Sequence, residues 1–477
     1  MKSLTILRAL SVLSISAGAC LTAGAARGDT TDDLLEKLRQ KGILTQAEVD
    51  QLKQRNAAAT PAPAPPPTTP VGDSGTVVHF LDKGIGVAVG PVNVTVSGEV
   101  NGFYVNDSPD SPGPHKIVAG GLAAVGPNDN SSIRNGLLPG DFNVDLATKQ
   151  EGYDIDVHFG LYPGLNSVSG VGGANSGGVT HALGTSGIDF RQEFLTVGTS
   201  TLGTIKIGRD IGLFGAEAIL NDFTLFGVGS TGGNVAPSNT SLGRIGLGYI
   251  YTDWIPQITY TTPKFGGFAA TVGVFQPFDA FNSSGLSGTL SGHGEPQFQG
   301  KIAYEVPVAP TSAFKAQFWT NVITQSLTSA GGGDALPTNH AVQGTGVDVG
   351  TKLDWGKAEF VGTGYFGSGI GTTALFFDAV APNGSPRDSR GGYLQGSYTI
   401  GERFTLSGSY GISELDLASG EFAPTLVKDN DSYSFGAKYH LTNWVNLIGE
   451  FTHTISTAHN GNQAQDNAFA AGGIAFF

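Results

Sequence analysis

The sequence predicts an all-β fold, a closed barrel of sixteen antiparallel strands behind a short N-terminal helical hairpin. Three observations lead to this prediction. Segments of alternating apolar and polar residues recur along the chain, as in YDIDVHFGL at 153–161, and side chains of a strand point alternately to opposite faces. These segments come in pairs, joined by short turns and separated by long loops. Glycine is abundant, with 72 of 477 residues and no strict period, which suits turns and loops.

Residues 1–26 have the features of a secretory signal peptide. Lys2 and Arg8 supply the charged start, an apolar stretch follows, and small residues at 24–26 suit cleavage. Cleavage there also removes Cys20, the only cysteine, so the exported chain would lack disulfides and thiolate metal sites. The alternative is a lipoprotein acylated on Cys20, although SAGAC lacks the usual bulky residue before the cysteine.

Residues 27–59 differ in character from everything that follows them. Apolar residues recur at helical spacing, Gly42 interrupts the pattern, and Thr45 with Glu48 forms a capping box for a second helix. This pattern predicts a periplasmic helical hairpin that self-associates as a coiled coil, because alone it cannot bury its apolar stripe. A plain stalk is the alternative.

The proline-rich segment 60–70 predicts an extended spacer, and the barrel is expected over 71–477. Seven short turns each join two strands, at 148–152, 200–203, 262–267, 307–313, 355–357, 400–403 and 440–444. The segments 92–105 and 468–477 add the first and last strands, which gives sixteen. The longest of the eight remaining loops are 106–140, 163–187 and 211–243. A further hairpin at 76–90 would raise the total to eighteen.

Short turns on one rim, long loops on the other and an even strand number are typical of bacterial outer-membrane barrels. A barrel of this width encloses water rather than an apolar core. Every candidate inward face is polar, so the apolar faces are expected to contact outer-membrane lipid. Aromatic residues flank most short turns and predict an interfacial girdle. They are Tyr260, Phe265, Tyr304, Trp355, Tyr398, Phe404, Tyr439 and Trp444.

The last strand ends in Phe477, with Phe469 at the same parity. A terminal Phe on an alternating strand resembles the signal that the barrel-assembly machinery reads, which implies that machinery as a partner. The segment TLGTIKIGRDIGLFG at 201–215 is similar to the one that leads into the third loop of general porins. With GILTQAEV in the hairpin and the proline linker, the chain resembles the DcaP-like and phosphate-selective porin group. It lacks the dense arginine ladder of a phosphate-selective pore, so phosphate specificity is not implied.

The resemblance implies a trimeric outer-membrane porin, a water-filled channel for passive diffusion of small hydrophilic solutes and ions. Small residues on the outer face of the first and last strands also favour a homotrimer, because they allow close packing in lipid. They are Gly98, Gly102, Ala471, Gly473 and Ala475.

Parity assigns the charged residues of the lumen, if apolar positions face lipid. The expected acidic residues are Glu99, Asp141, Asp145, Asp154, Asp156, Asp189, Glu193, Glu305, Asp348, Asp354, Glu359 and Glu450. The expected basic residues are Arg191, Lys206, Lys301, Lys315, Lys352, Lys357, Arg403 and Lys438. Strands one to three carry only acids, and strands eight to eleven carry four lysines. This split predicts a transverse field that favours polar solutes, and the excess of acids predicts a weak cation preference. The alternative is that these charges only keep the lumen wall hydrated and have no role in selectivity.

The loop at 211–243 contains AEAILNDF, which has helical spacing and is unusually apolar for a water-exposed loop. We expect this loop to fold inward and narrow the pore, with Asp210, Glu217 and Asp222 at the constriction. Packing on the rim is the alternative.

Enzyme signatures are poor, so no catalytic residue, metal or cofactor is expected. The nine histidines lack metal-ligand spacing, and no G-x-S-x-G elbow is present. Acids outnumber bases 40 to 26, which argues against nucleic acid as a partner. The alternatives to a channel are a phospholipase-like barrel enzyme and a secreted β-rich adhesin.

Overall fold

The computed structural model describes residues 78–81, 84–168, 173–174, 185–232, 240–331 and 341–477. The predicted signal peptide, helical hairpin and proline-rich linker lie outside these residues. Within them, no helix combines the length and the apolar character that crossing a membrane requires.

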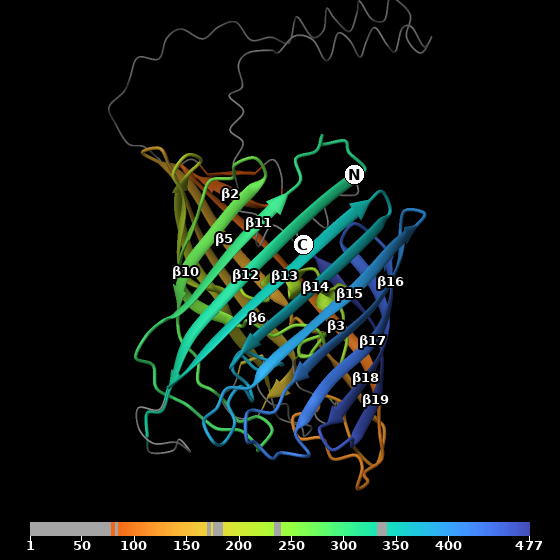
Figure 1. Ribbon diagram of the computed structural model, residues 1–477. Helices are drawn as coiled ribbons and strands as arrows, with labels where there is room; N and C mark the ends of the chain where they lie inside the picture. Colours follow the sequence, from red (N-terminus) through yellow and green to blue (C-terminus); the bar gives the residue numbers. More distant parts are fainter. Residues whose placement is uncertain (1–77, 82–83, 169–172, 175–184, 233–239, 332–340) are drawn as a thin grey trace, which may run out of the picture. The chain divides into compact units, whose positions relative to one another are not determined.

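The described chain forms a closed antiparallel barrel, made by β3 and the fifteen strands from β5 to β19 (Figure 1). Each strand pairs with the next one in sequence, and β19 pairs with β3 to close the ring. The bounds are β3 Val92–Pro109, β5 Asp141–Gln150, β6 Tyr153–Val168, β7 Thr185–Thr199, β8 Gly203–Ile211, β9 Trp254–Thr261, β10 Phe268–Phe275, β11 Gln297–Glu305, β12 Phe314–Thr328, β13 Ala341–Trp355, β14 Ala358–Ser368, β15 Asp388–Ile400, β16 Phe404–Leu415, β17 Val427–His440, β18 Val445–Ala458 and β19 Gln463–Phe476. The prediction of sixteen strands is therefore confirmed.

Three short strands lie outside this count. The strand β4 (Asn130–Arg134) pairs with the part of β3 that lies beyond β5. The predicted hairpin at 76–90 exists as β1 (Val78–Phe80) and β2 (Ile85–Val89). It pairs with the first residues of β3, on the edge that β19 uses further along. The hairpin therefore extends one edge of the barrel without widening the ring to eighteen strands.

All seven predicted short turns join the strands that the sequence assigned to them. The main difference is the loop between β8 and β9, which runs from 212 to 253 and is longer than predicted. By the usual orientation of outer-membrane barrels, the short turns are periplasmic and the long loops extracellular.

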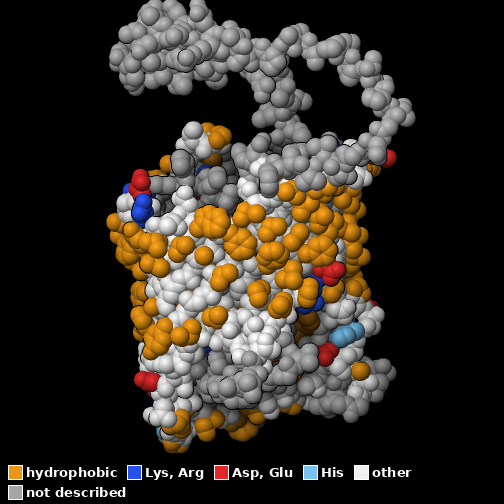
Figure 2. Space-filling model, turned by 180° about the vertical axis from the view of Figure 1, so that it is seen from behind, with side chains coloured by type: hydrophobic (Ala, Val, Ile, Leu, Met, Phe, Trp, Pro, Cys, Tyr) orange, Lys and Arg blue, Asp and Glu red, His pale blue; other side chains and the backbone are white. Residues whose placement is uncertain are grey.

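Alternation sorts the side chains of the strands as expected. Outward residues such as Val100 and Leu394 are well exposed, and hydrophobic side chains gather on the face of the outer wall that Figure 2 shows. Aromatic residues beside the short turns, including Phe265 and Trp355, are also exposed. Inward residues such as Asn321 are buried and polar.

The inner wall is not uniformly polar, contrary to the prediction. Trp319, Ile323 and Leu327 of β12 point inward and are buried. Ile323 and Leu327 join an apolar cluster with Phe214 and Phe376, which belong to two of the long loops. Loops that fold into the barrel give these wall residues an apolar contact, so a water-filled interior is confined to the part that the loops leave open.

Candidate functional site

The loop between β8 and β9, here called the inward loop (212–253), lies inside the barrel, as the sequence predicts. It contains the helix α4 (Ala216–Leu220) and the 3-10 helix η1 (Phe223–Phe226). Most of its described side chains are buried. A loop buried in this way needs partners for its backbone N–H groups.

Inward side chains of the wall supply those partners on one strand after another. Gly215 N–H donates to Asp348 Oδ2 at 2.8 Å, and Val228 N–H donates to Glu450 Oε2 at 2.7 Å. The acceptors of loop N–H groups include Gln299, Asp348, Gln395, Ser413 and Glu450, on β11, β13, β15, β16 and β18. The inward loop is therefore fastened along a large part of the circumference.

The three acids predicted for the constriction are buried, which corrects that prediction. Asp210 belongs to β8 rather than to the loop, and it accepts hydrogen bonds from Gln192 and Lys206. Glu217 Oε1 accepts a hydrogen bond from Lys301 Nζ at 2.9 Å and forms an ion pair with it. Asp222 caps η1, because its Oδ1 accepts the N–H of Thr224 at 3.0 Å. These carboxylates fasten the inward loop and the wall around it, since a charge inside packed protein requires a partner.

Asp348 and Glu450 also have a different role from the predicted one. Both point inward, yet they are 2% and 5% exposed because the inward loop covers them. Glu99 is likewise buried, and its Oε1 accepts a hydrogen bond from Asn101. Most of the acidic excess expected in the lumen is therefore not exposed there.

Glu193 lies on the outer face, so its assignment to the lumen is wrong. The register between β6 and β7 shifts at this point, where Gly160 pairs with Gln192 but Leu161 pairs with Phe190. Arg191 is the extra residue of a β-bulge, and a bulge reverses the alternation beyond it. Glu193 consequently stands opposite the exposed Phe159.

The residues Asp145, Asp154 and Asp156, here called the acidic wall, follow inward positions of β5 and β6. Asp145 binds His158 Nδ1 at 2.6 Å and remains 42% exposed. Asp154 binds Lys149 Nζ at 3.0 Å. Lys149 also occupies an inward position, so the prediction that the first three strands carry only acids is wrong.

The basic wall lies across the ring, on β12 to β17. It comprises Lys315, Lys352, Lys357, Arg403 and Lys438. Lys352 Nζ binds Glu359 at 2.9 Å, whereas the other four make no ion pair within the described chain. Lys357 and Arg403 lie in short turns at the periplasmic rim.

Two further predicted lumen residues, Arg191 and Lys206, are paired within the wall. Arg191 is buried, binds Asp189 at 3.1 Å and lies over the ring of Tyr162. Lys206 is half-buried, binds Asp210 and lies over the ring of Phe194.

The extracellular loops are joined to one another by Arg387, which is fully buried. Its guanidinium donates to Glu421 Oε2 at 3.0 Å, to Ser287 Oγ at 2.6 Å and to the carbonyl of Asp378 at 2.8 Å. The loops 276–296, 369–387 and 416–426 are held together in this way.

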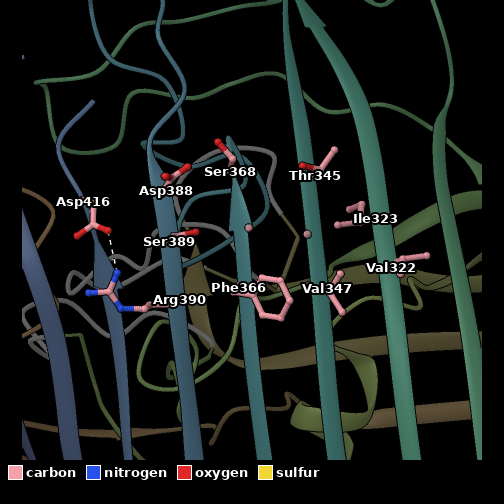
Figure 3. A pocket seen from close by; sticks show the side chains of 12 residues that line it. Val322, Ile323, Thr345, Val347, Phe366, Ser368, Asp388, Ser389, Arg390 and Asp416 are labelled. Atoms are coloured by element: carbon pink, nitrogen blue, oxygen red, sulfur yellow. Dashed lines mark hydrogen bonds and ion pairs between the residues drawn. The ribbon is translucent and has the colours of Figure 1, made fainter. Parts of the chain in front are cut away.

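A cavity of about 630 Å³ lies on the outer wall, across β12 to β15, with Asp416 just beyond the end of β16. Val322, Val347 and Phe366 line one part of it, and Arg390 lies at another, where it binds Asp416 (Figure 3). Val322 and Phe366 are exposed on the face that meets lipid, so this cavity is separate from the lumen. Among the described residues, no group of His, Cys, Asp and Glu side chains is placed to hold a metal ion.

Comparisons with known proteins agree with this architecture. A family model described as Gram-negative porin matches residues 75–459. No curated relative matches the sequence. The fold is similar to that of the outer-membrane channel DcaP of Acinetobacter baumannii, with a TM-score of 0.59, 15% identity and coverage of 81% of this chain and 97% of that one.

A second similar structure is an anion-selective porin from Comamonas acidovorans. Its TM-score is 0.52 at 14% identity, with coverage of 81% of this chain and 100% of that one. Likeness at such identities concerns the fold, whereas the family match spans most of the sequence. The chain therefore belongs to the Gram-negative porin family and forms a channel of the bacterial outer membrane for passive diffusion of small solutes.

Proposed function

We propose that this porin conducts small hydrophilic cations and anions alike, along separate walls of one passage that the inward loop narrows. The observation that carries this proposal is the burial of Asp348, Glu450 and Glu217, which removes the expected excess of acid from the lumen. The charges that remain beside the passage include the acidic wall and the basic wall, on opposite sides of the ring, and the inward Glu305, Asp354 and Glu359 lie among the lysines of the basic wall. A fixed charge acts over about a Debye length, roughly 8 Å at physiological salt, so each wall influences the ions that pass near it.

Reversal potentials in a salt gradient test this proposal. We expect a value near zero for the wild type. The variant with Lys315→Glu and Lys438→Glu should shift it toward cation selectivity, and the variant with Asp154→Asn and Asp156→Asn should shift it toward anion selectivity. Glu193→Gln is the matched control, because this carboxylate lies on the outer face. Strong selectivity of the wild type, or double variants that behave like the control, would contradict the two-wall arrangement.

We also propose that the channel is a homotrimer, packed through the outer face of β3 and β19. Gly473 pairs with Gly102, and Ala471 and Ala475 lie beside them. Such small side chains permit close approach between protomers. A mass measurement in mild detergent should give three chains, and a clean monomer would exclude this assembly.

We infer that the protein is not an enzyme. The His158–Asp145 pair is the type of arrangement that supports acid–base chemistry, but the other nitrogen of His158 faces Gln192 Oε1 at 3.3 Å, and no nucleophile is seen beside it among the described residues. The pure protein should therefore show no lipid hydrolysis. The terminal Phe477 exchanges backbone hydrogen bonds with Gly98, and we expect it to serve recognition by the barrel-assembly machinery during insertion.

A further inference from the structure

An apolar patch lies on the periplasmic side of the inward loop, inside the barrel. The rings of Phe226 and Phe476 meet edge to face, with centroids 5.4 Å apart. Phe223 lies against Gly436 of β17, where a Cβ atom would come within 2.6 Å of its ring. All three rings are half-buried, and because they point into the barrel, their exposed parts face the lumen. Phe226 and Phe476 also pack against a buried apolar cluster that includes Val228, Ile448 and Ile474, so the patch is an extension of packed protein toward the lumen.

A cation lies next to this patch. Lys438 follows Gly436 by two residues and points to the same face of β17, about 7 Å further toward the periplasm. It is half-buried and makes no hydrogen bond or ion pair within the described part of the chain. The register places it between Thr405 and Ile448, so one neighbour is small and polar and the other is apolar.

Nearby acids do not neutralise Lys438 directly. Glu450 already accepts two N–H groups of the inward loop, and Glu359 is bound to Lys352. The wall between Glu359 and Lys438 carries Ser397 and Ser407, whose side chains are short and uncharged. A positive charge without an ion-pair partner among the described residues, beside aromatic rings, suits a ligand that is anionic at one end and aromatic at the other.

We propose that Phe223, Phe226, Phe476 and Lys438 form a solute subsite for small aromatic carboxylates. The carboxylate would accept a charge-assisted hydrogen bond from Lys438 Nζ, which is stronger than a neutral one. The ring of the solute would add to the edge-to-face packing of Phe226 and Phe476, a geometry that aromatic groups prefer. This inference rests on the channel function and gives the basic wall a preferred class of solute, where the sequence alone predicted only polar solutes.

Single-channel recordings with added benzoate test the subsite. Benzoate should interrupt the current at about tenfold lower concentration than acetate, which lacks the ring, or benzyl alcohol, which lacks the charge. Lys438→Gln and Phe223→Leu should each weaken the benzoate effect about tenfold. Lys315→Gln is the matched control, because it removes an exposed lysine of the same wall at a distance from the rings.

Each outcome is decisive once the conductance in KCl shows that a variant has formed a channel. Equal interruption by benzoate and acetate would overturn the subsite, and so would an equal loss in Lys438→Gln and Lys315→Gln, since a diffuse positive wall would then suffice. If Phe223→Leu does not insert, Phe226→Leu takes its place. Failure of the two-wall proposal is distinguishable, because it concerns reversal potentials in simple salt without any aromatic solute.

Discussion

Lys301 and Lys315 lie on neighbouring strands and both point inward, but they have different surroundings. Lys301 is covered by the inward loop and bound to Glu217, with 11% of its side chain exposed. Lys315, nearer the periplasmic rim, is exposed and makes no ion pair within the described chain. The difference teaches that depth along the barrel decides the role of an inward charge. An inward charge beside the inward loop binds a loop residue and holds the loop in place. An inward charge between the loop and the periplasmic rim faces the passage.

The largest expected effect comes from removing a fastening charge. Lys301→Ala leaves Glu217 buried without a partner, and breaking a buried ion pair in this way costs about 3–5 kcal/mol. The inward loop should detach, with higher single-channel conductance and a lower heat-modification midpoint on gels. Lys315→Ala should leave both unchanged. If the two variants behave alike, depth does not separate the two roles.

A second variant addresses the acceptors of the loop. Glu450→Leu leaves the N–H groups of Val228 and Gly229 without an acceptor, and each such buried group costs about 1–3 kcal/mol. The heat-modification midpoint should fall and current noise should rise. Glu450→Gln keeps an acceptor oxygen and should lie between Leu and wild type. Equal midpoints for Gln and Leu would mean that the charge of Glu450, rather than its hydrogen bonds, matters.

Low pH tests a charge that holds loops together outside the membrane, the carboxylate of Glu421 bound to Arg387. Burial raises the pKa of Glu421, but hydrogen bonds from Arg387 and from the N–H of Ala418 lower it more, so the pKa lies below its ordinary value of 4.5. A carboxyl with a lowered folded-state pKa stabilises fully above its ordinary value, and this contribution is lost as the pH falls through the folded value. The loop 416–426 should therefore become protease-sensitive as the pH falls below 4.5 and through the lowered pKa of Glu421.

Glu421→Gln should make the same loop protease-sensitive already at pH 7, with little further change in acid. Glu295→Gln, which alters an exposed carboxyl of another extracellular loop, is the matched control and should retain the acid transition. A wild-type loop that is cleaved equally at pH 7 and pH 3 would show that the Arg387–Glu421 contact does not hold it.

The smallest effect is expected from a single exposed charge. Lys315→Gln should shift the reversal potential slightly toward cations and leave thermal stability unchanged, because exposed charges contribute little to folding. Reversal potential and heat modification measured on the same sample check both parts. A clear loss of stability would place Lys315 with the fastening charges.

The ring of strands was predictable because alternation and turn chemistry are local properties of the sequence. The inward position of the β8–β9 loop was predictable for a related reason, since AEAILNDF is too apolar for water. The roles of Glu217 and Asp348 were not predictable, because their partners lie 84 and 133 residues away in sequence and only the closed ring brings them together. Lys149 was overlooked because it lies beside a short turn, where parity is difficult to assign.

The bulge at Arg191 has a consequence for how this wall tolerates change during evolution. Arg191 and Gln192 both point inward across the bulge, so Glu193 lies on the outer face although Arg191, two positions before it, lies on the inner face. Deleting Arg191 would restore regular alternation and leave both Phe190 and Glu193 on the outer face. A one-residue insertion or deletion elsewhere in β7 would instead turn the residues on one side of the change to the opposite face. Lineages of this porin should therefore accept loss of the bulge residue far more readily than a one-residue change of length elsewhere in β7.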